Sequence, residues 1–205
     1  GQGFSGVTPP DTVGDVGGDY FIQAINDASG TKYTVYHKSD GSVAAGPFLL
    51  SSLGGTGGCA SGGGDPIVLY DPLADRWLLS EFASAGSTLC VYISKTGDPI
   101  TGGWWNYQFT TPNFPDYPKY GVWPDAYYVT SNENSPAAYA LQRTAMLAGQ
   151  AASFQRFTAS SLGGFSFQAL TPCDVDGTTA PPSGAPNYMM RHRDDEAHNA
   201  GSNNA

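Results

Sequence analysis

Three aspartates recur at matching places in the chain and could do chemistry together. Asp11, Asp65 and Asp116 each open a similar stretch, and they lie 54 and 51 residues apart. If equivalent positions of a repeat converge, these carboxylates would bind a cation such as Ca²⁺ or act as acid and base on a sugar. The alternative is that each aspartate caps a turn by accepting backbone N–H bonds.

A dense run of charged residues near the end of the chain is the second candidate site. Residues 191–198 read RHRDDEAH, in a chain with only 13% charged residues. Arg191 or Arg193 could hold an anionic sugar group, and a neighbouring carboxylate could serve as acid or base. The candidates for that acid or base are Asp194, Asp195 and Glu196, and His192 is a candidate ligand-binding residue. A salt-bridged loop is the alternative.

Aromatic side chains beside a lysine form a third candidate. The segment YPKYGVW places Lys119 between tyrosines and a tryptophan, with Tyr117 at its start. Aromatic rings stack on sugar rings and a lysine can hold a carboxylate, so Tyr117 and Lys119 are candidate ligand-binding residues. Trp105 joins them because adjacent Trp104 and Trp105 must point to opposite faces of a strand. Packing between neighbouring sheets is the alternative for aromatic residues of this kind.

A looser group of carboxylates near the start of the chain is the candidate metal site. Asp11, Asp15 and Asp19 follow one another at intervals of four residues. The ordered EF-hand pattern is absent from this segment. The net charge of −9 favours a cation, so we expect weak Ca²⁺ binding here. The alternative is that the acidic composition serves solubility alone.

Charge and cysteine content limit the partners and the compartment. A net charge of −9 repels polyanions, which argues against nucleic acid and anionic membranes as partners. No apolar run approaches 18 residues, so we expect no membrane span. A disulfide between Cys59 and Cys90 is plausible, and it favours a secreted, extracellular protein. Cys173 is then left over, with no partner evident in the sequence.

Short strands in a repeated unit must position these residues. Each unit of about fifty residues reads as four strands separated by Gly, Pro and Asp turns, which is typical of a β-propeller blade. A β-sandwich is the alternative. We expect one all-β domain over residues 1–205, with units at roughly 9–60, 61–112, 113–164 and 165–205. The fourth matches least, so we expect part of a ring that packs against the remainder of a longer chain or another copy.

Local patterns give three smaller expectations. Ser39-Asp40-Gly41 predicts a hairpin turn. Residues 141–150 predict a short helix, which Gly149 could end. The glycine-rich residues 54–65 predict a surface loop.

Several longer phrases carry a family resemblance. They are PPDTVGDVG (9–17), GDPIVLYDPLADRWLLSEFA (64–83), NFPDYPKYGVWPDAYYVTSNE (113–133), AYALQRTAMLAG (138–149) and MRHRDDEAHN (190–199). Together they resemble a group of large secreted bacterial proteins with a β-propeller-like domain, often followed by surface or adhesion modules. The resemblance implies a domain that runs on beyond the MRHRDD segment, and it implies no particular activity. A looser likeness to sialidase-type propellers lacks the Asp-box pattern of those proteins.

These observations lead to two functional expectations. The first is a secreted propeller that binds carbohydrate or another surface ligand, or that serves as a structural module of a larger extracellular assembly. The alternative is a glycoside hydrolase or polysaccharide lyase at the mouth of the channel, with Asp116 or the charged run in catalysis. The geometry of the carboxyl groups separates the two, because a hydrolase holds them about 5–5.5 or 6.5–9.5 Å apart.

Overall fold

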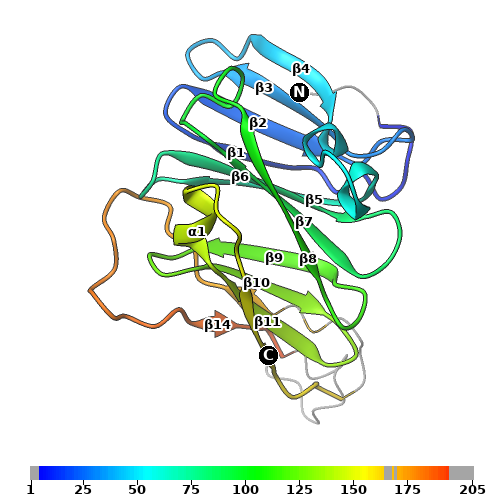
Figure 1. Cartoon of the computed structure of the whole chain (residues 1–205), viewed down its shortest axis with the longest axis vertical. Coiled ribbons are helices and arrows are strands. Elements are labelled where there is room, and N and C mark those ends of the chain that lie inside the picture. Colours follow the sequence, from blue (N-terminus) through cyan, green and yellow to red (C-terminus); the bar gives the residue numbers. More distant parts are fainter. Residues whose placement is uncertain (1–4, 164–167, 169, 194–205) are drawn as a thin grey trace, which may run out of the picture.

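The protein consists of antiparallel sheets that follow one another along the chain. The computed structural model describes residues 5–163, 168 and 170–193. Three sheets have four strands each, paired in chain order, and a short two-stranded sheet comes after them (Figure 1). This confirms the prediction of an all-β chain.

Each sheet consists of strands that are consecutive in the sequence. Sheet 1 holds β1 (Val13–Val16), β2 (Tyr20–Ile25), β3 (Lys32–His37) and β4 (Val43–Leu49). Sheet 2 holds β5 (Gly62–Asp71), β6 (Arg76–Ala83), β7 (Thr88–Ser94) and β8 (Trp104–Thr110). Sheet 3 holds β9 (Asp116–Val122), β10 (Tyr127–Asn132), β11 (Pro136–Leu141) and β12 (Phe154–Thr158). Sheet 4 holds β13 (Thr171–Pro172) and β14 (Met189–Met190). The first three sheets each lie within one unit of about fifty residues.

The turn between β3 and β4 shows how the sequence produces these meanders. Ser42 donates two hydrogen bonds to Oδ1 of Asp40, from its backbone N at 2.9 Å and from Oγ at 2.7 Å. Gly41 follows Asp40 with a φ of 72°, a conformation that glycine adopts without a steric cost. The predicted hairpin is therefore confirmed, and its turn residues hold it.

Two local predictions are partly wrong. The helix α1 covers only Arg143–Leu147, because Leu141 still belongs to β11 and pairs with β12. Residues 54–65 are not all loop either: a 3-10 turn, η2 (Gly58–Ala60), buries Cys59, and β5 begins at Gly62. A second 3-10 turn, η1 (Leu50–Leu53), precedes it. The start of α1 and the end of the glycine-rich loop both depend on contacts with residues distant in the sequence.

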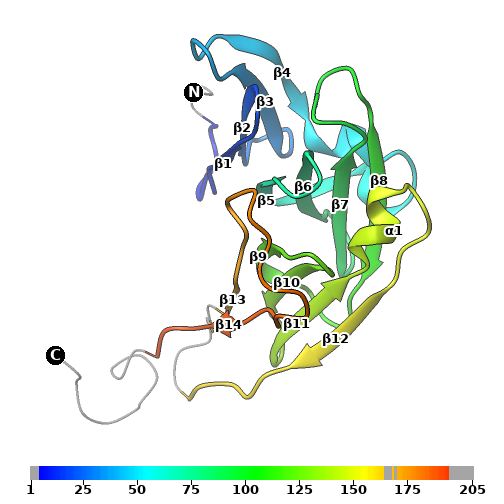
Figure 2. The same cartoon turned by 90° about the vertical axis from the view of Figure 1, so that its left-hand side faces the viewer.

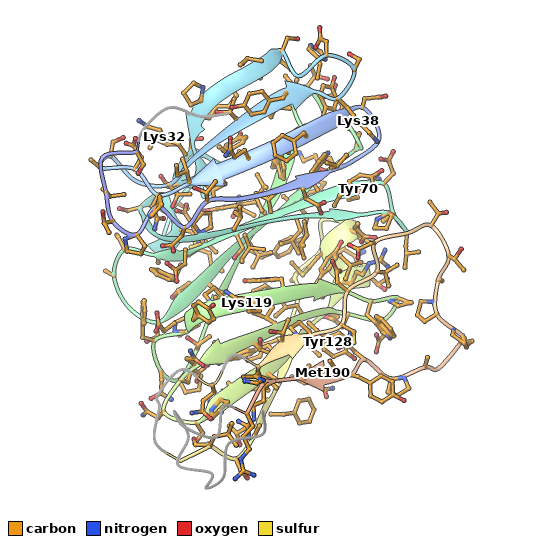
Figure 3. The ribbon with its side chains drawn as sticks, turned by 180° about the vertical axis from the view of Figure 1, so that it is seen from behind. Lys32, Lys38, Tyr70, Lys119, Tyr128 and Met190 are labelled. Atoms are coloured by element: carbon orange, nitrogen blue, oxygen red, sulfur yellow. A yellow bond between two sulfur atoms is a disulfide. The ribbon has the colours of Figure 1, made fainter. Side chains whose placement is uncertain are left out.

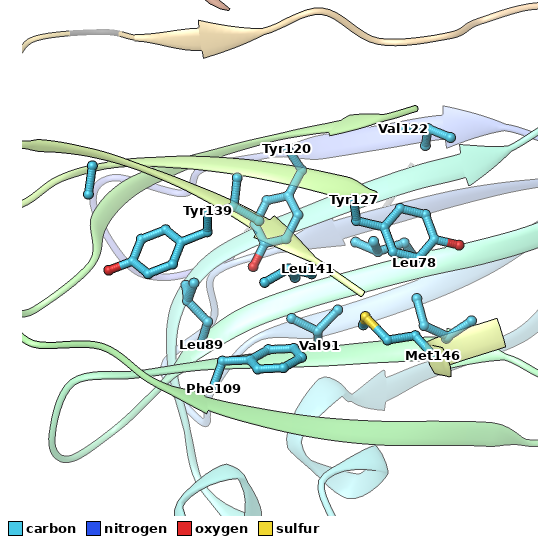
Figure 4. Packing of buried hydrophobic residues seen from close by; sticks show 13 residues of the cluster. Leu78, Leu89, Val91, Phe109, Tyr120, Val122, Tyr127, Tyr139, Leu141 and Met146 are labelled. Atoms are coloured by element: carbon cyan, nitrogen blue, oxygen red, sulfur yellow. The ribbon is translucent and has the colours of Figure 1, made fainter. Parts of the chain in front are cut away.

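Two apolar cores hold the sheets face to face. The core between sheets 1 and 2 includes Ile22, Val35, Trp77 and Leu79, all at most 1% exposed. The core between sheets 2 and 3 includes Leu78, Val91, Tyr139 and Met146 of α1, all fully buried (Figure 4). Leu78 and Leu79 are neighbours in β6 and serve opposite cores, because successive side chains of a strand point to opposite faces. Sheet 2 is therefore apolar on both sides.

The first strands of the sheets lie next to one another. Strand β1 contacts β5, β5 contacts β9, and β9 contacts β13. We call β1, β5 and β9 the inner strands. Figure 2 shows them in succession down the molecule, with β8 and β12 on the opposite side. Equivalent positions of the repeated units are thereby brought close together in space.

A buried ion pair ties sheet 2 to sheet 3. Asp71, the last residue of β5, is fully buried and receives two hydrogen bonds from Arg143, at 2.7 Å from Nε and 3.0 Å from a terminal nitrogen. The Tyr127 hydroxyl donates to the same carboxylate at 2.8 Å. Arg143 also donates to the carbonyl of Pro124 at 3.3 Å. The end of β5, the start of β10 and α1 thus share one polar centre.

A disulfide fixes the connection between sheets 1 and 2. Cys59 of η2 is bonded to Cys90 of β7, 31 residues further along, as the sequence predicts. Both sulfurs belong to the core between sheets 1 and 2. Cys173 is a free thiol and is half-buried.

We expect the disulfide to contribute about 3–4 kcal/mol to stability, because it closes a loop of 31 residues in the unfolded chain. Replacing Cys59 and Cys90 together by alanine should lower the free energy of unfolding in urea by about that amount. Cys173→Ala is the matched control and should change it little. Alkylation of the unreduced, denatured protein should add one adduct; three adducts would contradict the pairing.

Arg143→Ala should destabilise the protein by about 3–5 kcal/mol, because it leaves the charge of Asp71 buried without its partner. The double variant Asp71→Asn with Arg143→Met should recover part of that loss, since no uncompensated charge remains. The control is Lys32→Ala, which breaks the partly exposed pair with Asp27 (2.9 Å) and should cost at most about 1 kcal/mol. Equal losses for Arg143→Ala and Lys32→Ala in urea unfolding would contradict the role of Asp71.

Candidate functional site

The three recurring aspartates do converge. Asp11 lies just before β1, Asp65 lies within β5, and Asp116 opens β9. Asp65 interacts electrostatically with both Asp11 and Asp116, and its carboxyl shares a hydrogen bond with that of Asp11. A hydrogen bond between two carboxyls requires that one of them hold a proton. The inner strands therefore bring together what the sequence spaces about fifty residues apart.

The backbone at this place adopts an uncommon conformation. Asp11 has a φ of 41°, Asp65 of 50° and Tyr117 of 53°, all in the left-handed region that side chains disfavour. In the pairing of β5 with β6, Asp65 and Pro66 together face one residue, and in the pairing of β9 with β10, Tyr117 and Pro118 do the same. These bulges re-aim the side chains at the edge of each sheet.

The bulges correct one detail of the repeat. The sequence matches Asp116 to Asp65, but the position equivalent to Asp65 is Tyr117, which has nearly the same φ and also precedes a proline within a bulge. Asp116 lies one residue earlier, on the strand side of the bulge. Spacing alone could not reveal this, because the number of residues in a bulge is settled by strand pairing.

A lysine completes the group, which we call the inner-strand site: Asp11, Asp65, Asp116, Tyr117 and Lys119. Lys119 lies on β9, beside β5 (Figure 3). Its Nζ is 3.5 Å from the centre of the Tyr117 ring and donates to the carbonyl of Pro118 at 3.1 Å. The ammonium therefore covers one face of Tyr117.

The electrostatics of the site favour a shared proton. Burial, followed by the charge of Asp11, raises the pKa of Asp65 to about 6, and the charge of Lys119 partly opposes this rise. Burial lowers the pKa of Lys119, against the attraction of Asp65, Asp11 and Asp116. Asn26 donates to Oδ2 of Asp11 at 2.7 Å and orients that carboxyl. The site can accept and donate several hydrogen bonds at once near neutral pH.

A second acidic group lies further along the inner strands and was not predicted. Asp15 accepts a hydrogen bond from the backbone N of Tyr70 at 2.6 Å, and Asp174 accepts one from the backbone N of Val122 at 2.6 Å. Burial, followed by repulsion from the charge of Asp176, raises the pKa of Asp15 and of Asp174. The phrases TVGDVGG and TPCDVDG share a threonine and an aspartate at equal spacing, a signal that could have revealed the pair.

The carboxylates predicted to hold Ca²⁺ do not come together. Asp11 belongs to the inner-strand site, and Asp15 bonds Tyr70. Asp19 is exposed and lines a hollow of about 590 Å³ with Asp75 and Asp98. Within the part of the chain that the structure describes, no group of three His, Cys, Asp or Glu side chains could hold a metal ion. Ca²⁺ binding by Asp11, Asp15 and Asp19 stays a prediction.

Trp105 lies apart from the inner-strand site. It belongs to β8, three strands away from β5, which is about 14 Å across the sheet. The ammonium of Lys95 lies 3.9 Å from the centre of its ring. Both Trp104 and Trp105 are half-buried. Trp105 and Tyr117 therefore cannot stack on the same small ligand.

The charged run near the end of the chain is only partly described. Arg191 donates to Oε1 of Gln168 at 3.1 Å and to the carbonyl of Ser160 at 2.7 Å, so it holds two segments together. His192 and Arg193 are exposed. The remaining candidates, Asp194, Asp195 and Glu196, lie outside the described residues.

Comparisons with known proteins add no further constraint. No family model, no curated protein and no solved structure matches the chain. Among the described residues, no helix is both long and apolar enough to cross a membrane.

The proton held by Asp65 predicts a pH dependence of stability. The pKa of Asp65 is about 6 in the folded protein against an ordinary 3.8, so the folded state keeps a proton that the unfolded chain releases. The contribution of Asp65 to the free energy of unfolding should therefore fall as the pH rises from about 4 to about 6 and then level off.

Asp65→Asn removes this titration, and urea unfolding at several pH values should show a shallower fall than in the unsubstituted protein. Glu81, whose pKa burial raises to about 7, titrates in both proteins and cancels in the difference. The exposed Asp19→Asn is the control and should leave the profile unchanged. Identical profiles for Asp65→Asn and the unsubstituted protein would rule out the shared proton.

Proposed function

We propose that the chain is part of a secreted β-propeller whose inner-strand site binds a hydroxyl-rich ligand such as a carbohydrate. Three consecutive four-stranded meanders with adjoining first strands support the propeller, since blades are arranged in this way. The Cys59–Cys90 disulfide supports an extracellular setting. The resemblance to secreted bacterial propeller-like proteins agrees with both.

The observation that carries the ligand proposal is the convergence of Asp11, Asp65 and Asp116 around Lys119. Carboxylates accept hydrogen bonds from hydroxyl groups, and an ammonium donates to them. Tyr117 is 40% exposed and adds an aromatic surface at the rim of the site. A sugar offers hydroxyl groups and an apolar ring face, and therefore matches each of these features.

The Asp11–Asp65 pair, taken by itself, does not have the arrangement of the rival assignment, a glycoside hydrolase. The carboxyl of Asp65 shares a hydrogen bond with that of Asp11, whereas the two carboxyls of a retaining hydrolase lie about 5–5.5 Å apart. A binding or structural role within a larger extracellular assembly agrees better with such a pair.

The place of sheet 1 in the series and its exposed apolar side chains favour a protein partner. Strand β1 of sheet 1 contacts the inner strand β5, whereas β5 contacts an inner strand on each side, β1 and β9. Val16, Val43 and Phe48 of sheet 1 are 49%, 59% and 43% exposed. We propose that a further sheet, from the remainder of a longer chain or from another copy, extends the series there.

A glycan array followed by calorimetric titration tests the ligand proposal. For any glycan bound, Asp116→Asn, Lys119→Met and Tyr117→Ala should each weaken affinity at least about tenfold, or about 1.4 kcal/mol. Trp105→Ala, far from the site on β8, is the matched control and should leave affinity unchanged. Loss of binding in Trp105→Ala but not in the other three variants would place the ligand elsewhere, and no binding to any glycan would overturn the proposal.

A further inference from the structure

A buried glutamate lies between sheets 1 and 2 and takes no part in the proposed function. Glu81 is in the middle of β6 and is fully buried. Its Oε1 accepts a long hydrogen bond from the Tyr92 hydroxyl at 3.4 Å, and its Oε2 has no hydrogen-bond partner. Burial raises the pKa of this carboxyl to about 7, and hydrogen bonding from Thr31 and Tyr92 opposes this rise. A buried carboxyl with one unpartnered oxygen is stable only if it binds a proton or lies beside a positive charge.

Two other oxygens beside Glu81 also lack partners. Thr31 Oγ1 makes no hydrogen bond of normal geometry, and neither does Asn26 Oδ1. The orientation of the Asn26 amide is fixed, because its Nδ2 donates to Asp11 at 2.7 Å and to the carbonyl of Pro9 at 3.4 Å. Three of the seven buried, unpartnered side-chain atoms within the described residues therefore lie around the segment 62–64 of β5. Each lowers stability if it remains without a partner.

Glycines in β5 leave the room that these oxygens occupy. A Cβ atom on Gly62 would lie 1.9 Å from Oε2 of Glu81, and one on Gly64 would lie 3.1 Å from Oδ1 of Asn26. The two glycines are separated by one residue, so both oxygens lie along the same short segment of β5. A side chain at Gly62 would displace the carboxylate.

A hollow opens at the same segment. Its volume is about 230 Å³, and Asn26, Thr31 and residues 62–64 are among the residues that line it. One water molecule occupies about 30 Å³, so the hollow is large enough for an ion together with several waters. Asp27, which also lines it, is paired with Lys32 at 2.9 Å. The nearby carboxyls of Asp11 and Asp65 add to the negative potential.

The chemistry of the oxygens selects the ligand. Amide and carboxylate oxygens only accept hydrogen bonds, so their common partner must be a donor or a cation. Ca²⁺ takes six to eight ligands, which combine carboxylate, amide and backbone oxygens with waters. With one carboxylate in the set, affinity should resemble that of extracellular modules, on the order of 10⁻⁴–10⁻³ M.

We propose that Glu81, Asn26 and Thr31 are ligands of a Ca²⁺ ion bound between β5 and the loop that joins β2 to β3. This site is separate from the set Asp11, Asp15 and Asp19. It does not depend on the proposed carbohydrate function. The ion would fasten sheet 1 to sheet 2 on the side of the molecule next to the inner-strand site, with Asn26 shared between the two.

The test is a Ca²⁺ titration of the full chain after treatment with a chelator. The melting temperature should rise by about 3–5 °C at about 10 mM CaCl₂, against NaCl at equal ionic strength. Glu81→Gln should abolish this rise, and Thr31→Val should reduce it. Thr31→Ser keeps the hydroxyl and should retain the rise, as should Asp19→Asn. No rise in the unsubstituted protein, or a full rise in Glu81→Gln, would overturn the proposal.

A second measurement does not depend on the stability of the variants. Tb³⁺ replaces Ca²⁺ in oxygen sites and emits light when a nearby tyrosine is excited; Tyr92 is in contact with Glu81. Emission should appear on adding Tb³⁺, decrease on adding excess Ca²⁺, and be lost in Glu81→Gln. Emission that is unchanged in Glu81→Gln but lost in Asp19→Asn would assign the ion to the other set of carboxylates.

Discussion

The buried carboxylate of Asp71 is the interaction on which the order of the sheets depends. It ends β5 and receives hydrogen bonds from Arg143, 72 residues further along, and from Tyr127. It also accepts the backbone N–H groups of Leu73 and Ala74, both at 3.1 Å, which shapes the turn into β6. A buried charge of this kind has only one arrangement in which all its bonds are made, so it selects one position of sheet 3 against sheet 2.

Other aspartates connect neighbouring sheets along the inner strands by accepting backbone hydrogen bonds. Neighbouring sheets are not joined by a ladder of backbone hydrogen bonds, so the edge N–H groups of their inner strands need other acceptors. Asp15 supplies one to Tyr70, and Asp174 supplies one to Val122. Carboxylates thereby join successive sheets where the backbone cannot. This explains why a chain with few charged residues places so many acidic ones along the inner strands.

The carboxylates of the inner-strand site also lie between neighbouring inner strands, but Asp65 is not satisfied by hydrogen bonds from backbone N–H groups of the described residues in the way that Asp15 and Asp174 are. Asp65 lies in a bulge of β5, has a positive φ, and has a like-charged neighbour on each side. These features lower stability, and they persist because the two apolar cores over-determine the backbone. Groups held in this way are often found where a protein binds or transforms a ligand.

The sequence by itself determined the all-β class, the repeat of about fifty residues, the hairpin at Gly41 and the pairing of Cys59 with Cys90. Each of these follows from local turn chemistry, from strand patterning or from the small number of cysteines. It also indicated that Asp11, Asp65 and Asp116 belong together, because repeated positions converge when repeated sheets stack.

Only the three-dimensional structure shows that Asp15 and Asp19 lie away from Asp11, that Tyr117 rather than Asp116 matches Asp65, and that Trp105 lies three strands away from β5. It alone revealed Glu81 and Asp71 as buried carboxylates. Burial, bulges and pKa shifts depend on contacts between residues that lie up to 72 positions apart, and no local pattern specifies those contacts.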